Sequence, residues 1–575
     1  MMRGYIKLGL LVLYLASFQD YYLERLQALG ASFSLVLYLG TFTVLAAGLL
    51  ASAWIGVGVV RWTVAVAFSV SALFFDGYMR ITDSYLTYSA FVSMVYAGGF
   101  IQEALEQYHY AILLALAKSL LLLLGVGLRP GGQSPLPRAA LAWTTPLLAL
   151  ALLMGILFVR AGEGARGLPV MYTPLAYLGL FGYESVNNHV GPRQPVTLAH
   201  AGPAMAKDIV LIIDESIGGN YLDVNTPAGV VTHLTQPPPG VSVFNYGYAA
   251  SVANCSADTN VTLRYGGTRD DYLRINSTQP SIWQYAKAAG RSTVYIDGQR
   301  TGGYLQNLMT KTEKRDIDQF IQFDDTPVVQ RDMAALAKLV ELLGDDTPQL
   351  IVINKVGAHF PVHDKYPDEF ARYQPALPRG RFTDVADSGT REGFDGRPQD
   401  WVLYRNAYMN TVSWSVGEFF RRLFAQADLS KAVVIYTSDH GQDLHERGNP
   451  GLNTHCDSNP EAEEGLVPLV VIQGKGLQTL DWQAQLAANR NASSHYNIFP
   501  TLLGLLGYDR AGTASLYGQA LDVPTNDPFS FNVRFNARLG AKPDFRRIDL
   551  NEVITPDEIM VAPVAVPGGN QHAVK

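Results

Sequence analysis

The feature that most restricts how this chain can fold is an uncharged apolar run from Ser32 to Ala51, SFSLVLYLGTFTVLAAGLLA. About 20 apolar residues in a helix are long enough to cross the hydrocarbon core of a bilayer. Inside a bilayer the backbone N–H and C=O groups find partners only within the protein, and a single apolar run satisfies them as an α-helix. The run therefore predicts a membrane-spanning helix.

Four further apolar segments extend this prediction to an all-α transmembrane anchor of about five helices over residues 1–160. They are Leu8–Phe18, Trp54–Phe75, Tyr110–Leu128 and Leu141–Val159. The first is short enough to be the apolar core of a signal peptide. Because no small-residue cleavage site follows it, we favour an uncleaved helix.

Basic residues predict which side of the membrane the rest of the chain occupies. Arg3 and Lys7 precede the first apolar segment, and Arg129 and Arg138 lie in the loop before the last one. Lys and Arg are enriched in cytoplasmic loops, so these positions are expected inside the cell. Five helices that begin inside leave everything after Val159 outside, and cleavage of the first segment leads to the same final side.

The remaining sequence divides into a linker and an α/β domain. Residues 161–207 are interrupted by Gly and Pro and contain an amphipathic piece, Tyr172–Tyr183, that we expect along the membrane surface. Over residues 208–575 predicted strands alternate with predicted helices, which is the pattern of an α/β fold. A net charge of −7 without a Lys/Arg run argues against nucleic-acid binding, and two cysteines exclude a zinc ribbon.

Several predicted strands of this domain end in acidic or imidazole side chains. Ligands of open α/β sheets bind beyond the carboxyl ends of the strands. Carboxylates and imidazoles are typical ligands of a divalent transition metal. Each strand end alone is also typical of a turn whose Asp caps a helix, but together they predict a metal-centred site at one edge of the sheet. These segments are Asp208–Ile213 with Asp214 and Glu215, Thr293–Ile296 with Asp297, Leu350–Asn354 with GAHFPVHDKYP, and Val433–Thr437 with Asp439 and His440.

The order of these motifs resembles that of membrane-anchored phosphoethanolamine transferases, which belong to the alkaline phosphatase/sulfatase superfamily. The resemblance covers most of the α/β domain. It implies an alkaline-phosphatase-like catalytic domain over residues 208–575, held in the periplasm at a bacterial inner membrane. It rests on Glu215 after its strand, Asn254-Cys-Ser256, GAHFPVHDKYP, SDHGQDLHE, the later His455, and SHYNIFPTLLGLLG.

The resemblance also implies a set of metal ligands. Glu215, Asp439 and His440 would bind one zinc ion, with the hydroxyl of Ser256 as fourth ligand. Asp214 could recruit a second ion. Zinc polarises a hydroxyl toward the alkoxide and offsets charge on phosphoryl oxygens, which suits this ligand set to phosphoryl transfer.

Two histidines match positions where the family holds the phosphate of the transferred group, namely His359 and His455. Imidazoles near neutral pKa can hold a phosphate oxygen or pass a proton to the leaving alkoxide. The alternative for each is a loop histidine satisfied by its neighbours. His495 could merely cap the helix that follows it and is left out of the site.

The nucleophile is where the chain departs from the family. A direct overlay places Ala257 at the position of the family's nucleophilic Thr, and an alanine cannot act. Ser256 lies one residue earlier, at the expected entrance of a helix that continues through Thr259, where N–H groups stabilise phosphate. Thr259 would fall about one turn inside that helix. Ser256 is therefore the predicted nucleophile, and Thr259 is the alternative.

The two cysteines, Cys255 and Cys456, each adjoin a predicted site residue. In an oxidising compartment a disulfide between them would tie the nucleophile segment to the loop of His455. Two free thiols are the alternative.

We therefore expect a metal-dependent, monomeric enzyme. It would move phosphoethanolamine, or a related phospho-alcohol, from a membrane phospholipid such as phosphatidylethanolamine to an envelope lipid or glycan through a covalent phospho-Ser/Thr intermediate. A sulfatase or phosphodiesterase-type hydrolase is the alternative, although Cys255 to Thr259 lacks the Pro and Arg of the sulfatase signature. A non-enzymatic accessory protein is a third possibility, against which the metal-type residues weigh.

Overall fold

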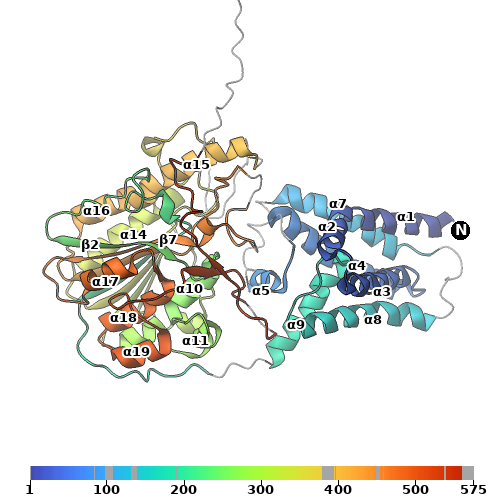
Figure 1. Ribbon diagram of the computed structural model, residues 1–575, viewed down its shortest axis with the longest axis horizontal. Coiled ribbons are helices and arrows are strands. Elements are labelled where there is room, and N and C mark those ends of the chain that lie inside the picture. Colours follow the sequence, from blue (N-terminus) through green and yellow to red (C-terminus); the bar gives the residue numbers. More distant parts are fainter. Residues whose placement is uncertain are drawn as a thin grey trace, which may run out of the picture. The chain divides into compact units, whose positions relative to one another are not determined.

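The described part of the chain forms two compact units (Figure 1). The helical unit comprises Met1–Val190 and Arg534–Asp544, and the α/β unit comprises Gly191–Val533 and Phe545–Lys575. The computed structural model describes residues 2–82, 85–96, 108–130, 139–187, 192–378, 394, 396–448, 453–457, 459–536 and 539–559.

The apolar segments of the predicted anchor coincide with helices in the structure. α3, α4 and α7 are long and apolar enough to cross a membrane, whereas the apolar stretches of α1 and α8 in the described chain are shorter. Of the predicted cytoplasmic loop, residues 131–138 lie outside the described residues. The helices of this unit are α1 (Met2–Ala16), α2 (Gln19–Leu29), α3 (Phe33–Ala53), α4 (Gly58–Thr82), α5 (Tyr88–Tyr96), α7 (His109–Gly127), α8 (Ala139–Val159) and α9 (Thr173–Asn187).

The basic residues inside the apolar helices have partners within the unit. Arg61 donates from Nε to the carbonyl of Gly127 at 3.0 Å and from Nη1 to the carbonyl of Ile55 at 2.7 Å. Lys118 Nζ lies 3.3 Å from a carboxylate oxygen of Asp76. Charged side chains within a membrane-type bundle face its interior and pair there, because an unpaired charge in hydrocarbon is costly. The charges are therefore compatible with spanning helices.

A short segment from far along the sequence belongs to the helical unit. Arg534 lies 3.1 Å from Glu163, and the backbone N–H of Leu539 donates to Glu184 at 3.1 Å. Asn536 donates to the hydroxyl of Ser93 at 2.8 Å. These polar contacts attach residues Arg534–Asp544 to this unit, which no local sequence pattern predicted.

The α/β unit is built on an eight-stranded sheet with the order β4-β3-β5-β1-β6-β7-β2-β8. β1 lies between β5 and β6 and runs parallel to both, while β7 runs antiparallel to β6. β9 and β10 form a separate antiparallel pair. The strands are β1 (Asp208–Asp214), β2 (Val241–Ala250), β3 (Ser292–Asp297), β4 (Gln319–Gln322), β5 (Gln349–Asn354), β6 (Ala432–Ser438), β7 (Leu466–Gly474), β8 (Ser493–Ser494), β9 (Ser530–Asn532) and β10 (Phe545–Arg547).

The predicted strands β1, β3, β5 and β6 are confirmed, whereas β2 was not expected. Its pairing with β7 shifts register between Asn245 and Tyr248. Gly247 stands inside this irregularity with φ of 77°, a backbone conformation that glycine adopts without steric cost. The bulge interrupts the alternation of side chains by which a strand is recognised in a sequence.

Helices cover both faces of the sheet, with α14 and α16 on one face and α18 and α19 on the other (Figure 1). The main helices of the unit are α10 (Ser256–Tyr265), α11 (Tyr272–Thr278), α12 (Ile282–Ala288), α13 (Lys311–Lys314), α14 (Val328–Leu343), α15 (Pro398–Val412), α16 (Phe419–Gln426), α17 (Trp482–Asn489), α18 (Ile498–Leu505) and α19 (Arg510–Tyr517), and a π-helical turn, Ser413–Glu418, joins α15 to α16.

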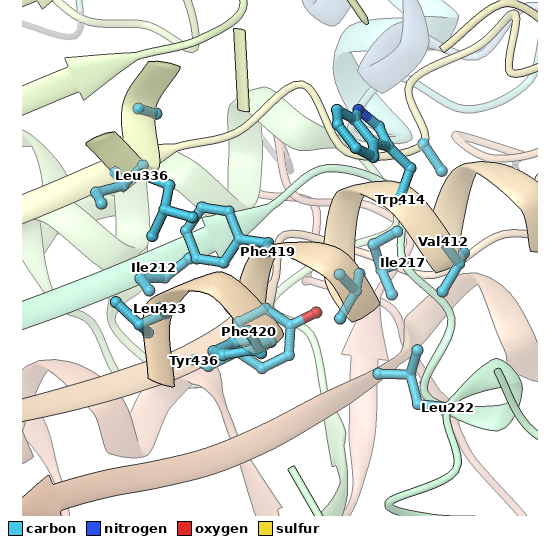
Figure 2. Close-up of a cluster of buried hydrophobic side chains, with 14 of the residues drawn as sticks. Ile212, Ile217, Leu222, Leu336, Val412, Trp414, Phe419, Phe420, Leu423 and Tyr436 are labelled. Atoms are coloured by element: carbon cyan, nitrogen blue, oxygen red, sulfur yellow. The ribbon is translucent and has the colours of Figure 1, made fainter. Parts of the chain in front are cut away.

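The central strand β1 supplies both halves of the core. Its successive side chains point to opposite faces, so Val210 and Ile212 pack with α14 and α16, whereas Ile209 and Leu211 pack with α12 and α18. This two-sided burial accounts for the uninterrupted apolar sequence of the strand. Figure 2 shows the first of these clusters, in which the ring of Phe420 packs edge-on against Tyr436 with the ring centroids 4.8 Å apart.

Replacing Phe420 with Ala is expected to lower the free energy of unfolding of the α/β unit by about 3–5 kcal/mol, because a fully buried ring is lost and a cavity remains. Phe424 lies one turn later on α16 and is only partly buried, so Phe424→Ala removes the same ring at a smaller cost. Thermal unfolding of both variants measures the difference. Equal decreases in Tm would contradict this account of the core.

Candidate metal centre

Three buried side chains meet at the carboxyl ends of two adjacent strands. The register pairs Asp214 of β1 with Ser438 of β6, so the next residues, Glu215 and Asp439, leave the sheet side by side. Ligand atoms of Glu215, Asp439 and His440 all lie within 4.8 Å of one another. His440 Nε2 is 3.5 Å from Glu215 Oε1 and 3.7 Å from Asp439 Oδ2.

Ser256 is the first residue of α10, as the sequence predicted, and its hydroxyl adjoins this cluster. Its Oγ donates to Glu215 Oε1 at 3.1 Å and lies 3.1 Å from His440 Nε2. The hydroxyl of Thr259 instead donates to the carbonyl of Ala253 at 3.2 Å. The structure thus brings Ser256 against the cluster and engages Thr259 with the backbone.

Hydrogen bonds orient the ligand atoms. His440 Nδ1 lies 2.7 Å from the carbonyl of Gly441, which only accepts, so Nδ1 carries a proton and Nε2 is the nitrogen that faces the cluster. The backbone N–H of Ser216 donates to Asp439 Oδ1 at 3.0 Å. Among the described residues, the other oxygen of Asp439 is buried and has no hydrogen-bond partner. That unsatisfied oxygen is a position where a cation fits.

The electrostatics of the cluster favour positive charge. Burial raises the pKa of Asp439 to about 8, and the charge of Glu215 adds to the rise. Burial opposes a charged His440, but the carboxylates of Asp439 and Glu215 raise its pKa to about 9. Two buried carboxylates, an imidazole nitrogen and a hydroxyl fit zinc among the divalent metals. The residues present therefore fit the predicted ion.

The two predicted phosphate-binding histidines lie near this cluster, and each keeps a small part of its surface exposed. The ring of His455 stacks on that of His440, with centroids 4.5 Å apart. His359 follows β5, and its Nδ1 donates to the carbonyl of Phe360 at 2.7 Å. Burial lowers the pKa of His359 to about 4 and lowers the pKa of His455 well below its ordinary value, so both rings are neutral at pH 7.

Asp214 lies beside the cluster but already has a cation. Lys355 Nζ is 2.8 Å from Asp214 Oδ2, and both side chains are fully buried. Tyr436 donates to the same oxygen at 3.1 Å, and Lys355 also donates to the carbonyl of Ser415 in the π-helical turn. In the described chain the metal-capable group consists of Glu215, Asp439 and His440, without Asp214. A second ion at Asp214 stays a prediction.

Gln299 contributes to the site and was not predicted. Its amide donates to Glu215 Oε2 at 3.0 Å and to the carbonyl of Lys355 at 2.8 Å. It thereby holds the Glu215 oxygen to which Ser256 does not donate. Only its position, two residues after the strand-ending Asp297, could have pointed to it.

His495, which was left out of the predicted site, has structural partners. Its Nε2 lies 2.9 Å from the hydroxyl of Thr437, and the backbone N–H of Val252 donates to its Nδ1 at 3.3 Å. It connects the end of β6 to the segment that precedes Ser256.

A disulfide joins Cys255 to Cys456, so the predicted bridge is present. The two cysteines are 201 residues apart in sequence. The bridge links the residue before Ser256 to the residue after His455. It therefore restricts the distance between the hydroxyl segment and the histidine loop.

Removing the bridge with Cys255→Ser and Cys456→Ser together is expected to destabilise the α/β unit by about 2–4 kcal/mol, because the unfolded chain loses a long-range constraint. Thermal unfolding in the oxidised and reduced states measures the effect. The parent protein, unfolded without reductant, should show no reactive thiol. Two reactive thiols under those conditions would contradict the bridge.

Zinc added to the metal-stripped protein should raise its Tm, with a stabilisation of about 2.7 kcal/mol when free zinc is 100-fold above Kd. Asp439→Asn should remove most of this shift, because it removes a ligand charge. Asp297→Asn is the matched control, since Asp297 is also a buried acid at a strand end but lies outside the metal-capable group. Equal zinc shifts in both variants would contradict the assigned ligands.

Comparison with known proteins places this geometry in a family. The family model described as Sulfatase matches residues 207–508. The Kdo(2)-lipid A phosphoethanolamine 7''-transferase of Escherichia coli is 23% identical over 360 residues, which cover 58% of each chain. The phosphoethanolamine transferase CptA of Salmonella typhimurium is 23% identical over 327 residues, or 54% of this chain and 53% of that one. The chain thus spans somewhat more than half the length of these curated relatives.

A solved structure shares the fold of both units. The integral membrane lipooligosaccharide phosphoethanolamine transferase A of Neisseria meningitidis superposes with a TM-score of 0.61 at 18% identity, covering 88% of this chain and 96% of that one. The predicted combination of a helical region and an alkaline-phosphatase-like α/β domain is therefore confirmed. Since the matched family model spans more than half of the sequence and contains the metal-capable cluster, the chain belongs to the sulfatase family.

Proposed function

We propose that this protein is a metal-dependent transferase that moves phosphoethanolamine, or a related phospho-alcohol, from a membrane phospholipid to an envelope lipid or glycan. The observation that carries the proposal is the hydroxyl of Ser256, at the start of α10 and 3.1 Å from both Glu215 Oε1 and His440 Nε2. The curated relatives named as phosphoethanolamine transferases support the group transferred. Phosphatidylethanolamine is the donor that would supply it.

Ser256 is the proposed nucleophile. Its hydroxyl proton passes to Glu215, to which it already donates, and Oγ attacks the donor phosphorus. The bond from phosphorus to the diacylglycerol oxygen breaks, and that oxygen takes up the proton held by Glu215 and leaves as diacylglycerol. N–H groups at the start of α10 face the developing charge on the phosphoryl oxygens. An ion held by Glu215, Asp439, His440 and Ser256 supplies Lewis acidity that lowers the pKa of the hydroxyl.

The second half of the reaction returns Ser256 to its starting state. An acceptor hydroxyl attacks the phosphorus, the bond to Ser256 Oγ breaks, and Oγ takes up the proton that the acceptor hydroxyl loses. His359 has an unprotonated nitrogen at pH 7 that can take the acceptor's proton, although its lowered pKa makes it a weaker base than a free imidazole. His455, stacked on His440, is suited to hold a phosphate oxygen.

A hydrolase of the same superfamily, a sulfatase or phosphodiesterase, is the second candidate. It is favoured only by the family that the chain matches. The sulfatase signature begins with a cysteine, and here the corresponding Cys255 is joined to Cys456 and not available for chemistry. We therefore rank the transferase first.

The helical unit and the charge pattern support a location for this activity. We propose that α1 and α8 cross the membrane together with the three candidate spans, in the bacterial inner membrane. With Arg3 and Lys7 inside, five spans place the α/β unit in the periplasm. The protein would act there as a monomer on lipids of the same membrane.

Ser256→Ala is expected to lower transfer by at least about 10³-fold with little change in Tm, because it removes the attacking oxygen and no buried packing. Thr259→Ala is the matched control and should retain measurable transfer, since its hydroxyl bonds the backbone. Mass spectrometry of envelope lipids and glycans measures transfer in cells that express each variant. Intact-protein mass spectrometry with phosphatidylethanolamine and no acceptor should show a phosphoethanolamine adduct on the parent only.

The opposite pattern, an inactive Thr259→Ala and an active Ser256→Ala, would overturn the assigned nucleophile. Release of free phosphoethanolamine at the same rate with and without acceptor would favour the hydrolase.

A further inference from the structure

The helical unit contains a cavity that the proposed transfer does not use. It has a volume of about 760 Å³, in the range of ligand-binding pockets, and its lining comes from α2, α3, α8 and the segment after α8. Every residue that lines it belongs to the helical unit. The cavity is therefore formed within the helical unit alone.

The shape of the cavity follows from how α3 and α8 meet. A side-chain carbon at Gly48 of α3 would lie 2.8 Å from Cβ of Ala149 of α8, so the two helices touch at that level. Farther along, Leu37 of α3 and Gly155 of α8 line the cavity. A side-chain carbon at Gly155 would meet no atom within 4 Å. The helices therefore touch at one level and leave an apolar groove at the other.

Three arginines, Arg25, Arg160 and Arg166, line the cavity, and two of them follow the last residue of α8. Arg166 pairs with Glu24. The side-chain carbons of Arg25 pack over Gly167, and a Cβ added at Gly167 would lie 2.4 Å from Cβ of Arg25. The buried Nε of Arg25 has no hydrogen-bond partner among the described residues. Arg160 is exposed at the end of α8. Within the described chain, Arg25 and Arg160 thus bring positive charge to the apolar groove, beside the C-terminal end of α8.

We infer that this groove binds a glycerophospholipid, with an acyl chain between α3 and α8 and the phosphate at Arg25 and Arg160. An apolar groove alone would accept any hydrocarbon, but guanidinium groups in its lining select a phosphate, with which Arg forms paired charge-assisted hydrogen bonds. A membrane-type bundle offers phospholipid as the abundant ligand that has both parts. The inference adds a lipid site to the proposed function, which places its chemistry in the α/β unit.

The test uses full-length protein purified in mild detergent, with bound lipid measured by native mass spectrometry. The probes are phosphatidylglycerol and diacylglycerol with identical acyl chains, which differ in the phosphate headgroup. The parent should bind phosphatidylglycerol about tenfold more tightly than diacylglycerol. Arg25→Gln and Arg160→Gln together should remove this preference without changing Tm.

Filling the groove tests its location. Gly155→Leu places a side chain in the cavity and should abolish retention of phosphatidylglycerol. Gly40→Leu is the matched control, because Gly40 is an equally open helical glycine of α3 that does not line the cavity. If the two leucine variants retained phosphatidylglycerol equally, the lipid would be bound only at the protein surface, and the inference would be overturned. Equal binding of the two probes to the parent would also overturn it, because the arginines would then select nothing.

Discussion

The interaction on which the rest of the site depends is the parallel pairing of β1 with β6. Their register sets Asp214 beside Ser438, so that Glu215 and Asp439 leave the sheet together. The hydrogen bond from the Ser216 N–H to Asp439 then joins residues 223 apart in sequence. A slip of one residue would turn every side chain of the strand to the opposite face and would separate these ligands. The buried apolar faces of β1 make such a slip costly, so the core determines the geometry of the site.

Two carboxylates at this sheet edge are buried in different ways. Asp214 has a permanent partner in the Lys355 ammonium, which is also held by the carbonyl of Ser415. Each aspartate keeps one buried oxygen without a hydrogen-bond partner among the described residues, but Asp439 faces a second carboxylate, Glu215, where Asp214 faces an ammonium group. Burial of unpaired negative charge is unfavourable, so a site of this kind has a high affinity for a cation. Asp214 therefore belongs to a structural ion pair with Lys355, whereas Asp439 and Glu215 belong to a site that favours a bound cation.

The helical unit shows the same distinction among its basic residues. Arg61 is buried and its Nε and Nη1 are bonded to backbone carbonyls, which makes it part of the packing between α4 and α7. Lys118 has a carboxylate partner in Asp76. Arg25, in contrast, has a buried nitrogen without a hydrogen-bond partner in the described chain and lines a cavity. Charged groups that have partners within the protein stabilise the fold. A charged group at a cavity that lacks such a partner is available to a ligand.

The sequence by itself determined the features that depend on neighbouring residues. The uncharged run Ser32–Ala51 and the apolar run Val433–Thr437 specify helix and strand without reference to the rest of the chain. The entrance of a helix at Ser256 followed from local turn and capping residues, and the order of motifs implied the ligands around it. The tertiary structure decided what depends on contacts between distant segments. Gln299 reaches Glu215 only because β3, β5 and β1 are neighbours in the sheet, and strand order is a long-range property that no local pattern encodes.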